Sequence, residues 1–123
     1  MRFARAVFLV AGTYGLLVIA PMYFLETRIG RDLPPAITHP EYFYGFLGVT
    51  IAWQIVFLVL ARDPLRYRAM ILPSIVEKFG LGIPVIFLFM QHRIPLIVLS
   101  LGSVDWVLAA LFVAAYITTG RDH

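Results

Sequence analysis

Four long apolar segments, separated by short connectors, constrain this chain more than any other feature of its sequence. They cover about residues 6–25, 42–61, 69–90 and 95–118. A helix of about 20 residues crosses the roughly 30 Å hydrocarbon core of a bilayer, so each segment is long enough to span a membrane. We therefore predict an all-α fold, a four-transmembrane-helix antiparallel bundle that forms a single integral membrane domain over residues 1–123.

The composition supports a membrane protein and excludes several kinds of site. The chain is 61% hydrophobic and 14% charged, far more apolar than a soluble domain of its length. It has no cysteine, which excludes disulfides, thiolate metal sites and a cysteine nucleophile. The net charge of +3 is modest, and the arginines lie in several connectors, so we expect no nucleic-acid partner.

The arginines also predict the direction of the spans. In the predicted topology, six of them fall on the side of the two termini and three on the other side. The first group is Arg2, Arg5, Arg62, Arg66, Arg68 and Arg121, and the second is Arg28, Arg31 and Arg93. Because cytoplasmic loops carry the excess of basic residues, we predict a multi-pass protein of the cell (inner) membrane with both termini in the cytoplasm.

Charged residues inside two of the spans provide the candidate site. Glu77 and Lys78 interrupt the third span, and Asp105 interrupts the fourth. Ionisable groups at membrane depth are rare, so these need a partner, water or a route to the interface. Gln54 in the second span lies at a similar depth, and Thr50 lies one helical turn from it on the same face. We take these five residues as ligand- or ion-binding candidates.

Helical spacing leaves two arrangements open for the charged residues. In one, Lys78 pairs with Asp105, and Glu77 lies on a face shared with Pro73, Ser74, Gly80 and Pro84. That face would point into the bundle, with a kink near Pro84, and burial would favour the neutral form of Glu77. In the other, Lys78 extends toward the membrane surface. A purely structural role for the whole polar set is the alternative to a binding role.

Small residues at four-residue spacing predict where helices approach closely. The pairs are Ala11 with Gly15, Gly48 with Ala52, and Ala110 with Ala114, and Gly45 extends the second pair. We expect contacts within the bundle, with homo-oligomer contacts as the alternative. Because the connections are short, the second and third spans, and likewise the third and fourth, should pack as antiparallel neighbours.

The connector between the first two spans is a further candidate region. Pro34, Pro35 and Pro40 stiffen it, and it could form a lid over the bundle. His39, Glu41 and His92 lie on the same predicted side, but their spacing matches no defined metal site. Solvated loop residues are the expected outcome, and we predict no metal site, no cofactor and no catalytic residue.

The stretch from Tyr44, Gly45 and Phe46 to Gln54, the basic turn, and the last helix with Asp105 and Trp106 resemble small bacterial four-helix membrane proteins of the DoxX-like type. That resemblance implies a compact membrane bundle, in some members an accessory to redox enzymes. Asp63, Pro64, Glu77 and Pro84 are similar to a pattern in the sterol-isomerase and sigma-2-like bundle family, although the first span carries no acidic residue.

The leading functional expectation is a non-enzymatic bundle that binds a lipophilic small molecule or a partner membrane protein around Gln54, Glu77, Lys78 and Asp105. Membrane lipid is its expected surrounding partner. The first alternative is a proton- or ion-coupled transport unit, oligomeric, with Glu77 as carrier. The second is a membrane enzyme that acts on a lipid or quinone. A wet path to both surfaces would favour transport, and an apolar pocket that ends on a carboxyl group would favour binding or catalysis.

Overall fold

The computed structural model describes residues 2–32 and 37–122, which contain helices and no strand. The elements are α1 (Arg2–Ile19), the 3-10 segment η1 (Ala20–Phe24), α2 (Glu26–Asp32), α3 (Pro40–Arg62), the 3-10 segment η2 (Arg68–Met70), α4 (Ile71–Met90) and α5 (Leu96–Asp122). In these ranges, four helical stretches are long and apolar enough to cross a membrane: Arg2–Phe24, Pro40–Arg62, Arg68–Met90 and Leu96–Arg121. The predicted all-α class and its four spans are confirmed.

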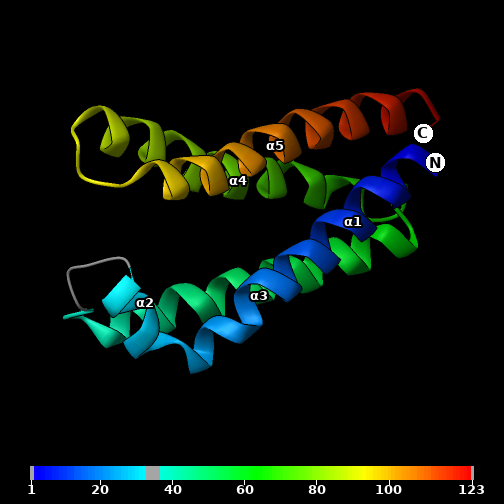
Figure 1. Ribbon diagram of the computed structural model, residues 1–123. Helices are drawn as coiled ribbons and strands as arrows, with labels where there is room; N and C mark the ends of the chain where they lie inside the picture. The colour runs from blue at the N-terminus through cyan, green and yellow to red at the C-terminus, as the bar shows by residue number, and fades with distance from the viewer. Residues whose placement is uncertain (1, 33–36, 123) are drawn as a thin grey trace.

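The long helices form two antiparallel hairpins that meet at one end and part at the other (Figure 1). α1 packs along α3, and α4 packs along α5, whereas α3 and α4 contact each other little. Both termini and the α3–α4 turn lie at the end where the hairpins meet, which we call the closed end. At the opposite, open end, the α4–α5 turn lies well away from η1 and α2.

The expectation that α3 and α4 pack as neighbours is therefore wrong. The short turn brings only the end of α3 and the start of α4 together, and each helix then follows a different partner. α3 follows α1, and α4 follows α5, so the distance between the hairpins grows toward the open end (Figure 1). The result is a wedge, closed on one side of the membrane domain and open on the other.

Glycines permit the close approach of helices within each hairpin. A Cβ atom on Gly12 of α1 would come within 2.9 Å of the Gln54 carbonyl oxygen on α3. A Cβ atom on Gly82 of α4 would come within 2.9 Å of Nε1 of Trp106 on α5. Membrane helices associate mainly through close packing, so small residues at these contacts define which helices pair.

The predicted small-residue stripes differ in their outcome. Ala11 and Gly15 are buried, which confirms the expectation of packing within the bundle for the first stripe. Gly45, Gly48 and Ala52 are exposed, so the expectation is wrong for the second stripe. The residues of α3 that approach Gly12 and Gly15 of α1 are instead Gln54 and Leu58. Ala110 is exposed and Ala114 half-buried, so the third stripe lies at the margin of the α5 contacts.

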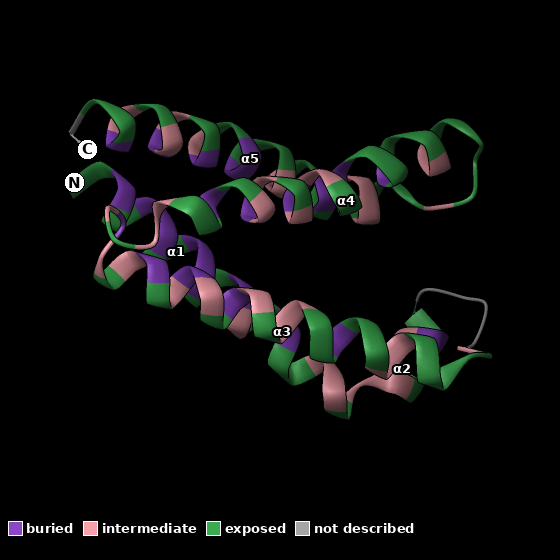
Figure 2. Cartoon of the chain, turned by 180° about the vertical axis from the view of Figure 1, so that it is seen from behind, coloured by how far each residue is buried: buried purple, intermediate pink, exposed green. Residues whose placement is uncertain are grey.

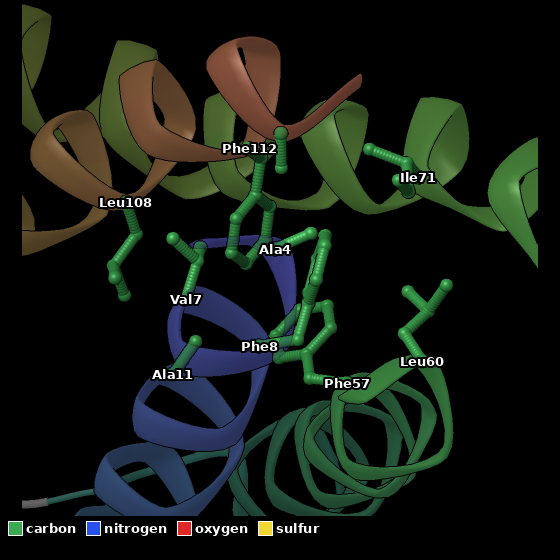
Figure 3. Packing of buried hydrophobic residues seen from close by; sticks show 10 residues of the cluster. Ala4, Val7, Phe8, Ala11, Phe57, Leu60, Ile71, Leu108 and Phe112 are labelled. Atoms are coloured by element: carbon green, nitrogen blue, oxygen red, sulfur yellow. The ribbon is translucent and has the colours of Figure 1, made fainter. Parts of the chain in front are cut away.

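Three phenylalanines join the two hairpins at the closed end (Figure 3). Phe8 of α1, Phe57 of α3 and Phe112 of α5 are fully buried. The ring centroid of Phe112 lies 4.6 Å from that of Phe8 and 5.0 Å from that of Phe57, within the range of favourable aromatic pairs. Smaller apolar residues complete this cluster: Ala4, Val7, Ala11, Leu60, Ile71, Leu108 and Ala115.

At the same end, Arg68 of η2 connects the start of the second hairpin to α5 through hydrogen bonds. Its Nη2 donates a hydrogen bond of 2.7 Å to the Tyr116 carbonyl oxygen, and its Nε donates one of 3.1 Å to Oγ1 of Thr119. The guanidinium carbon also lies 3.8 Å from the centroid of the Tyr116 ring. Buried residues are concentrated toward this end and become sparse toward the open end (Figure 2).

The inward face of α4 differs from the predicted one. Its buried residues are Ile71, Ser74, Lys78, Gly82 and Val85. Of the predicted face, Ser74 is buried and Glu77 half-buried, but Gly80 and Pro84 are exposed. Lys78 lies on the side of α4 that packs against α5, whereas Glu77 and Gly80 line the cavity between the hairpins. The helix continues through Pro84 as one element.

The connector between α1 and α3 contains a helix that the sequence reasoning did not predict. Glu26–Asp32 forms α2, which lies at the open end beside the start of α3 (Figure 1). Arg28 and Asp32 approach to 3.4 Å on its exposed side. Pro34 and Pro35, the core of the predicted lid, lie outside the described residues.

Candidate functional site

The predicted candidate residues meet at the place where the hairpins separate. Thr50, Gln54, Glu77, Lys78 and Asp105 all line one cavity of about 510 Å³. All four long helices contribute to its wall, which is mainly apolar. The phenylalanine cluster fills the space between the hairpins on the closed side, so the polar residues lie near the narrow end of an apolar wedge.

Lys78 lies between the two carboxyl groups. Its Nζ is 3.4 Å from Oδ1 of Asp105 on α5 and 3.7 Å from Oε2 of Glu77 on its own helix. The Lys78 side chain is only 6% exposed. The arrangement that pairs Lys78 with Asp105 is thus the one found, and the alternative in which Lys78 extends to the membrane surface is wrong. The three residues together carry one excess negative charge when all are ionised.

The lysine is also tied to the aromatic cluster. Its Nζ lies 5.1 Å from the centroid of the Phe57 ring, within the range of a cation–π contact. Phe57 in turn packs edge-on against Phe112. Lys78, at the base of the cavity, therefore contacts the aromatic cluster that joins the two hairpins.

Gln54 occupies the facing wall and is almost completely buried, with 1% of its surface exposed. Its Nε2 donates a hydrogen bond of 2.9 Å to the carbonyl oxygen of Thr50, which fixes the orientation of the amide. The amide lies against Gly15 of α1, where any Cβ atom would overlap it. Gly15 thus provides the room that lets Gln54 turn inward.

Two buried acceptors at this site have no hydrogen-bond partner among the described residues. They are Oε1 of Gln54 and Oε2 of Glu77. A buried polar atom without a partner costs about 1–3 kcal/mol, so such atoms are rare in folded proteins. Of the two, Oε2 of Glu77 still lies 3.7 Å from the charged Nζ of Lys78, whereas Oε1 of Gln54 lies against Gly15.

The apolar walls were only partly predicted from the sequence. On α1, Tyr14 lines the cavity, whereas its neighbour Thr13 is exposed and does not. The wall residues of α3 that sequence reasoning missed are Phe46, Val49 and Trp53. Together with Thr50 and Gln54 they are spaced by three and four residues, which places all five on one face of the helix. The sequence alone could therefore have predicted this face.

An indole hydrogen bond holds the α4–α5 wall together. Nε1 of Trp106 donates to the Gly82 carbonyl oxygen at 2.9 Å. The Trp106 ring packs edge-on against Phe79, with centroids 5.1 Å apart. Because Gly82 and Val85 belong to the buried face of α4, this contact sets the position of the helix that carries Glu77 and Lys78.

The predicted histidine and glutamate residues at the open end do not form one cluster. Nδ1 of His39 lies 3.1 Å from Oε1 of Glu41 at the start of α3. His92 lies in the α4–α5 turn of the other hairpin and has a left-handed backbone conformation, with φ of 59°. Within the described residues, no three metal-ligating side chains come together.

Comparison with known proteins adds no relative to this description. The chain matches no protein family model, and no curated protein and no solved structure matches it significantly. The resemblance to DoxX-like and sterol-isomerase-like bundles therefore stays a prediction, and the function has to be argued from the cavity itself.

Proposed function

We propose that this protein is a non-enzymatic membrane protein that binds a lipophilic ligand in the wedge between its two hairpins. The observation that carries the proposal is an apolar cavity that ends on Gln54, Glu77, Lys78 and Asp105. A cavity of about 510 Å³ lies within the range of small-molecule sites. Such sites combine apolar walls with a few polar groups that orient the ligand, which is the distribution found here.

The ligand reaches the site from the bilayer. α3 and α4 contact each other little, so the wedge has a lateral opening along the hydrocarbon region. A molecule that is already dissolved in the membrane enters without crossing an aqueous barrier. Its apolar part replaces lipid chains between the hairpins, and its polar end contacts Glu77, Lys78 and Asp105 at the base of the cavity.

The polar end of the ligand donates hydrogen bonds. The polar groups at the base of the cavity are the Gln54 amide, the carboxyl groups of Glu77 and Asp105, and Lys78 between these two carboxyl groups. A hydrogen bond from a hydroxyl or amide donor of the ligand to a charged group contributes about 1.5–3 kcal/mol. The preferred ligand is therefore amphipathic, with a long apolar body and a donor group at one end.

The topology follows from the arginines. The closed end carries both termini and the turn with Arg62, Arg66 and Arg68, and it faces the cytoplasm in the proposed orientation. The membrane is the bacterial cell membrane. The wedge then opens toward the outer leaflet, so the ligand comes from that leaflet.

Proton- or ion-coupled transport is the second candidate. The observation in its favour is Glu77, a carboxyl group at membrane depth whose Oε2 has no hydrogen bond among the described residues and lies 3.7 Å from Nζ of Lys78. Against it stands the cluster of Phe8, Phe57 and Phe112, which fills the closed end where a path to the second surface would run. An enzyme that acts on a lipid or quinone has less support, because the carboxyl groups pair with Lys78.

Two glycines allow a matched test of the binding proposal. Gly80 lines the cavity, Gly45 does not, and both have open space where a side chain would begin. We expect Gly80→Leu to fill the cavity and Gly45→Leu to leave it free, with neither disturbing the packing. Purified proteins would be extracted with organic solvent, and the released lipophilic molecules quantified per protein by mass spectrometry.

The expected result is that Gly80→Leu loses a species that both the unmodified protein and Gly45→Leu retain. Lipids that cover the outside of the bundle contribute equally to all three samples and serve as the internal reference. Identical profiles in the three proteins would contradict the binding proposal.

A further inference from the structure

A second groove lies at the closed end, on the outside of the bundle between α1 and α3. Its volume is about 420 Å³, and its lining is Arg5, Ala6, Leu9, Leu58, Ala61 and Arg62. None of these residues lines the wedge cavity. The groove faces the surroundings of the protein, not the space between the hairpins, so its occupant is independent of the ligand proposed above.

The groove has a regular construction. Arg5 and Leu9 are one turn apart on α1, and Arg62 and Leu58 are one turn apart on α3. Because the two helices are antiparallel, both arginines lie toward the closed end and both leucines one turn deeper. Ala6 and Ala61 lie beside the arginines, and their short side chains leave the groove hollow between them.

The charges at the mouth of the groove are available to a ligand. Among the described residues, neither Arg5 nor Arg62 forms an ion pair, and both are exposed. The nearest acidic residue in the sequence, Asp63, accepts a hydrogen bond of 3.2 Å from the Arg66 backbone nitrogen. Arg68 is occupied by the carbonyl oxygen of Tyr116. Arg5 and Arg62 thus differ from Arg68, and they are the two arginines that line the groove.

We propose that this groove is a binding site for one anionic phospholipid from the leaflet on the side of the termini. Its phosphate lies between the guanidinium groups of Arg5 and Arg62, and one acyl chain lies over Ala6 and Ala61 between Leu9 and Leu58. Guanidinium groups match the geometry of phosphate oxygens, and basic pockets between membrane helices bind anionic head groups. The combination of two cations above an apolar channel fits a phospholipid better than a soluble anion or an apolar lipid.

The test compares lipid binding to the purified protein by native mass spectrometry in mild detergent. The probes are phosphatidylglycerol and phosphatidylcholine with the same acyl chains. We expect one phosphatidylglycerol to bind in preference to phosphatidylcholine. Each arginine near the surface contributes about a fivefold factor, so Arg5→Gln with Arg62→Gln should weaken that binding about 25-fold.

Two further variants separate a defined site from general attraction to basic residues. Arg66→Gln with Arg121→Gln removes the same charge at the same end outside the groove, and it should leave the single bound phosphatidylglycerol in place. Ala6→Leu with Ala61→Leu keeps both arginines but fills the groove, and it should displace the lipid. Circular dichroism of each variant checks that the helices are retained.

Equal weakening by the two arginine pairs, or no preference for phosphatidylglycerol, would overturn the proposal. Retained lipid in the double leucine variant would overturn it as well. Competition by soluble glycerol phosphate at the same concentration would show that the arginines bind a free anion, which also contradicts a phospholipid site.

Discussion

At the scale of single residues, Lys78 determines the charge balance of the wedge. It approaches Asp105 to 3.4 Å and Glu77 to 3.7 Å, and all three side chains are largely buried. When Glu77 or Asp105 is neutralised by substitution, a balanced pair remains. When Lys78 is removed, two carboxyl groups stay in an apolar surrounding without a counter-charge, which is the costly case for buried ions.

The first prediction follows from this asymmetry. Lys78→Met should lower the free energy of unfolding by about 3–5 kcal/mol, the cost typical of breaking a buried ion pair by removing one partner. Glu77→Gln should cost much less, because Lys78 and Asp105 remain paired. Denaturant unfolding in detergent micelles, followed by circular dichroism, measures both. A Glu77→Gln variant that loses as much stability as Lys78→Met would contradict the assigned charge balance.

At the scale of elements, the contact between α1 and α3 depends on one glycine. A Cβ atom at Gly15 would overlap the side-chain amide of Gln54, and the Gln54 side chain is held by its hydrogen bond to Thr50. The chain therefore cannot place alanine there without moving the glutamine or separating the helices. Gly15 links the packing of the first hairpin to the polar floor of the cavity.

The second prediction tests that link. Gly15→Ala should lower the free energy of unfolding by about 1–3 kcal/mol, the usual cost of overpacking. In a Gln54→Ala background the same change should cost much less, because the overlapping amide is gone. Gly45→Ala, at an exposed helical position with open space, serves as the control and should not destabilise the protein. Additive effects of the Gly15 and Gln54 substitutions would refute the contact.

The elements also show what the sequence could and could not predict. The four spans could be predicted because the length and hydropathy of each segment are properties of that segment alone. The inward face of α4 was predicted only in part: Ser74 is buried and Glu77 and Gly80 line the cavity, but Pro84 is exposed, and the side that packs against α5 carries Lys78. Which of two polar faces points inside depends on the neighbouring helix, and helical spacing alone carries no such information.

At the scale of the whole molecule, the wedge is a consequence of unequal packing along the helices. Phe8, Phe57 and Phe112 bring three helices together at the closed end. Toward the open end the described contacts are mainly within each hairpin (Figure 1). The sequence brought Gln54, Glu77, Lys78 and Asp105 to notice as candidates, but their meeting at one cavity required this long-range arrangement. In the proposed function, the ligand enters from the bilayer between α3 and α4, which contact each other little.

The most direct test of ligand binding in the wedge uses a photoactivatable lipophile. The protein would be reconstituted in liposomes that contain a long-chain alcohol with a diazirine group, and the labelled residues mapped by mass spectrometry. Labels are expected on cavity residues such as Trp53 and Leu81, in excess of those on Leu17 and Val76, which are 73% and 69% exposed on the outside. Gly80→Leu should abolish that excess. Labelling that simply follows exposure to the bilayer, unchanged in Gly80→Leu, would contradict the account.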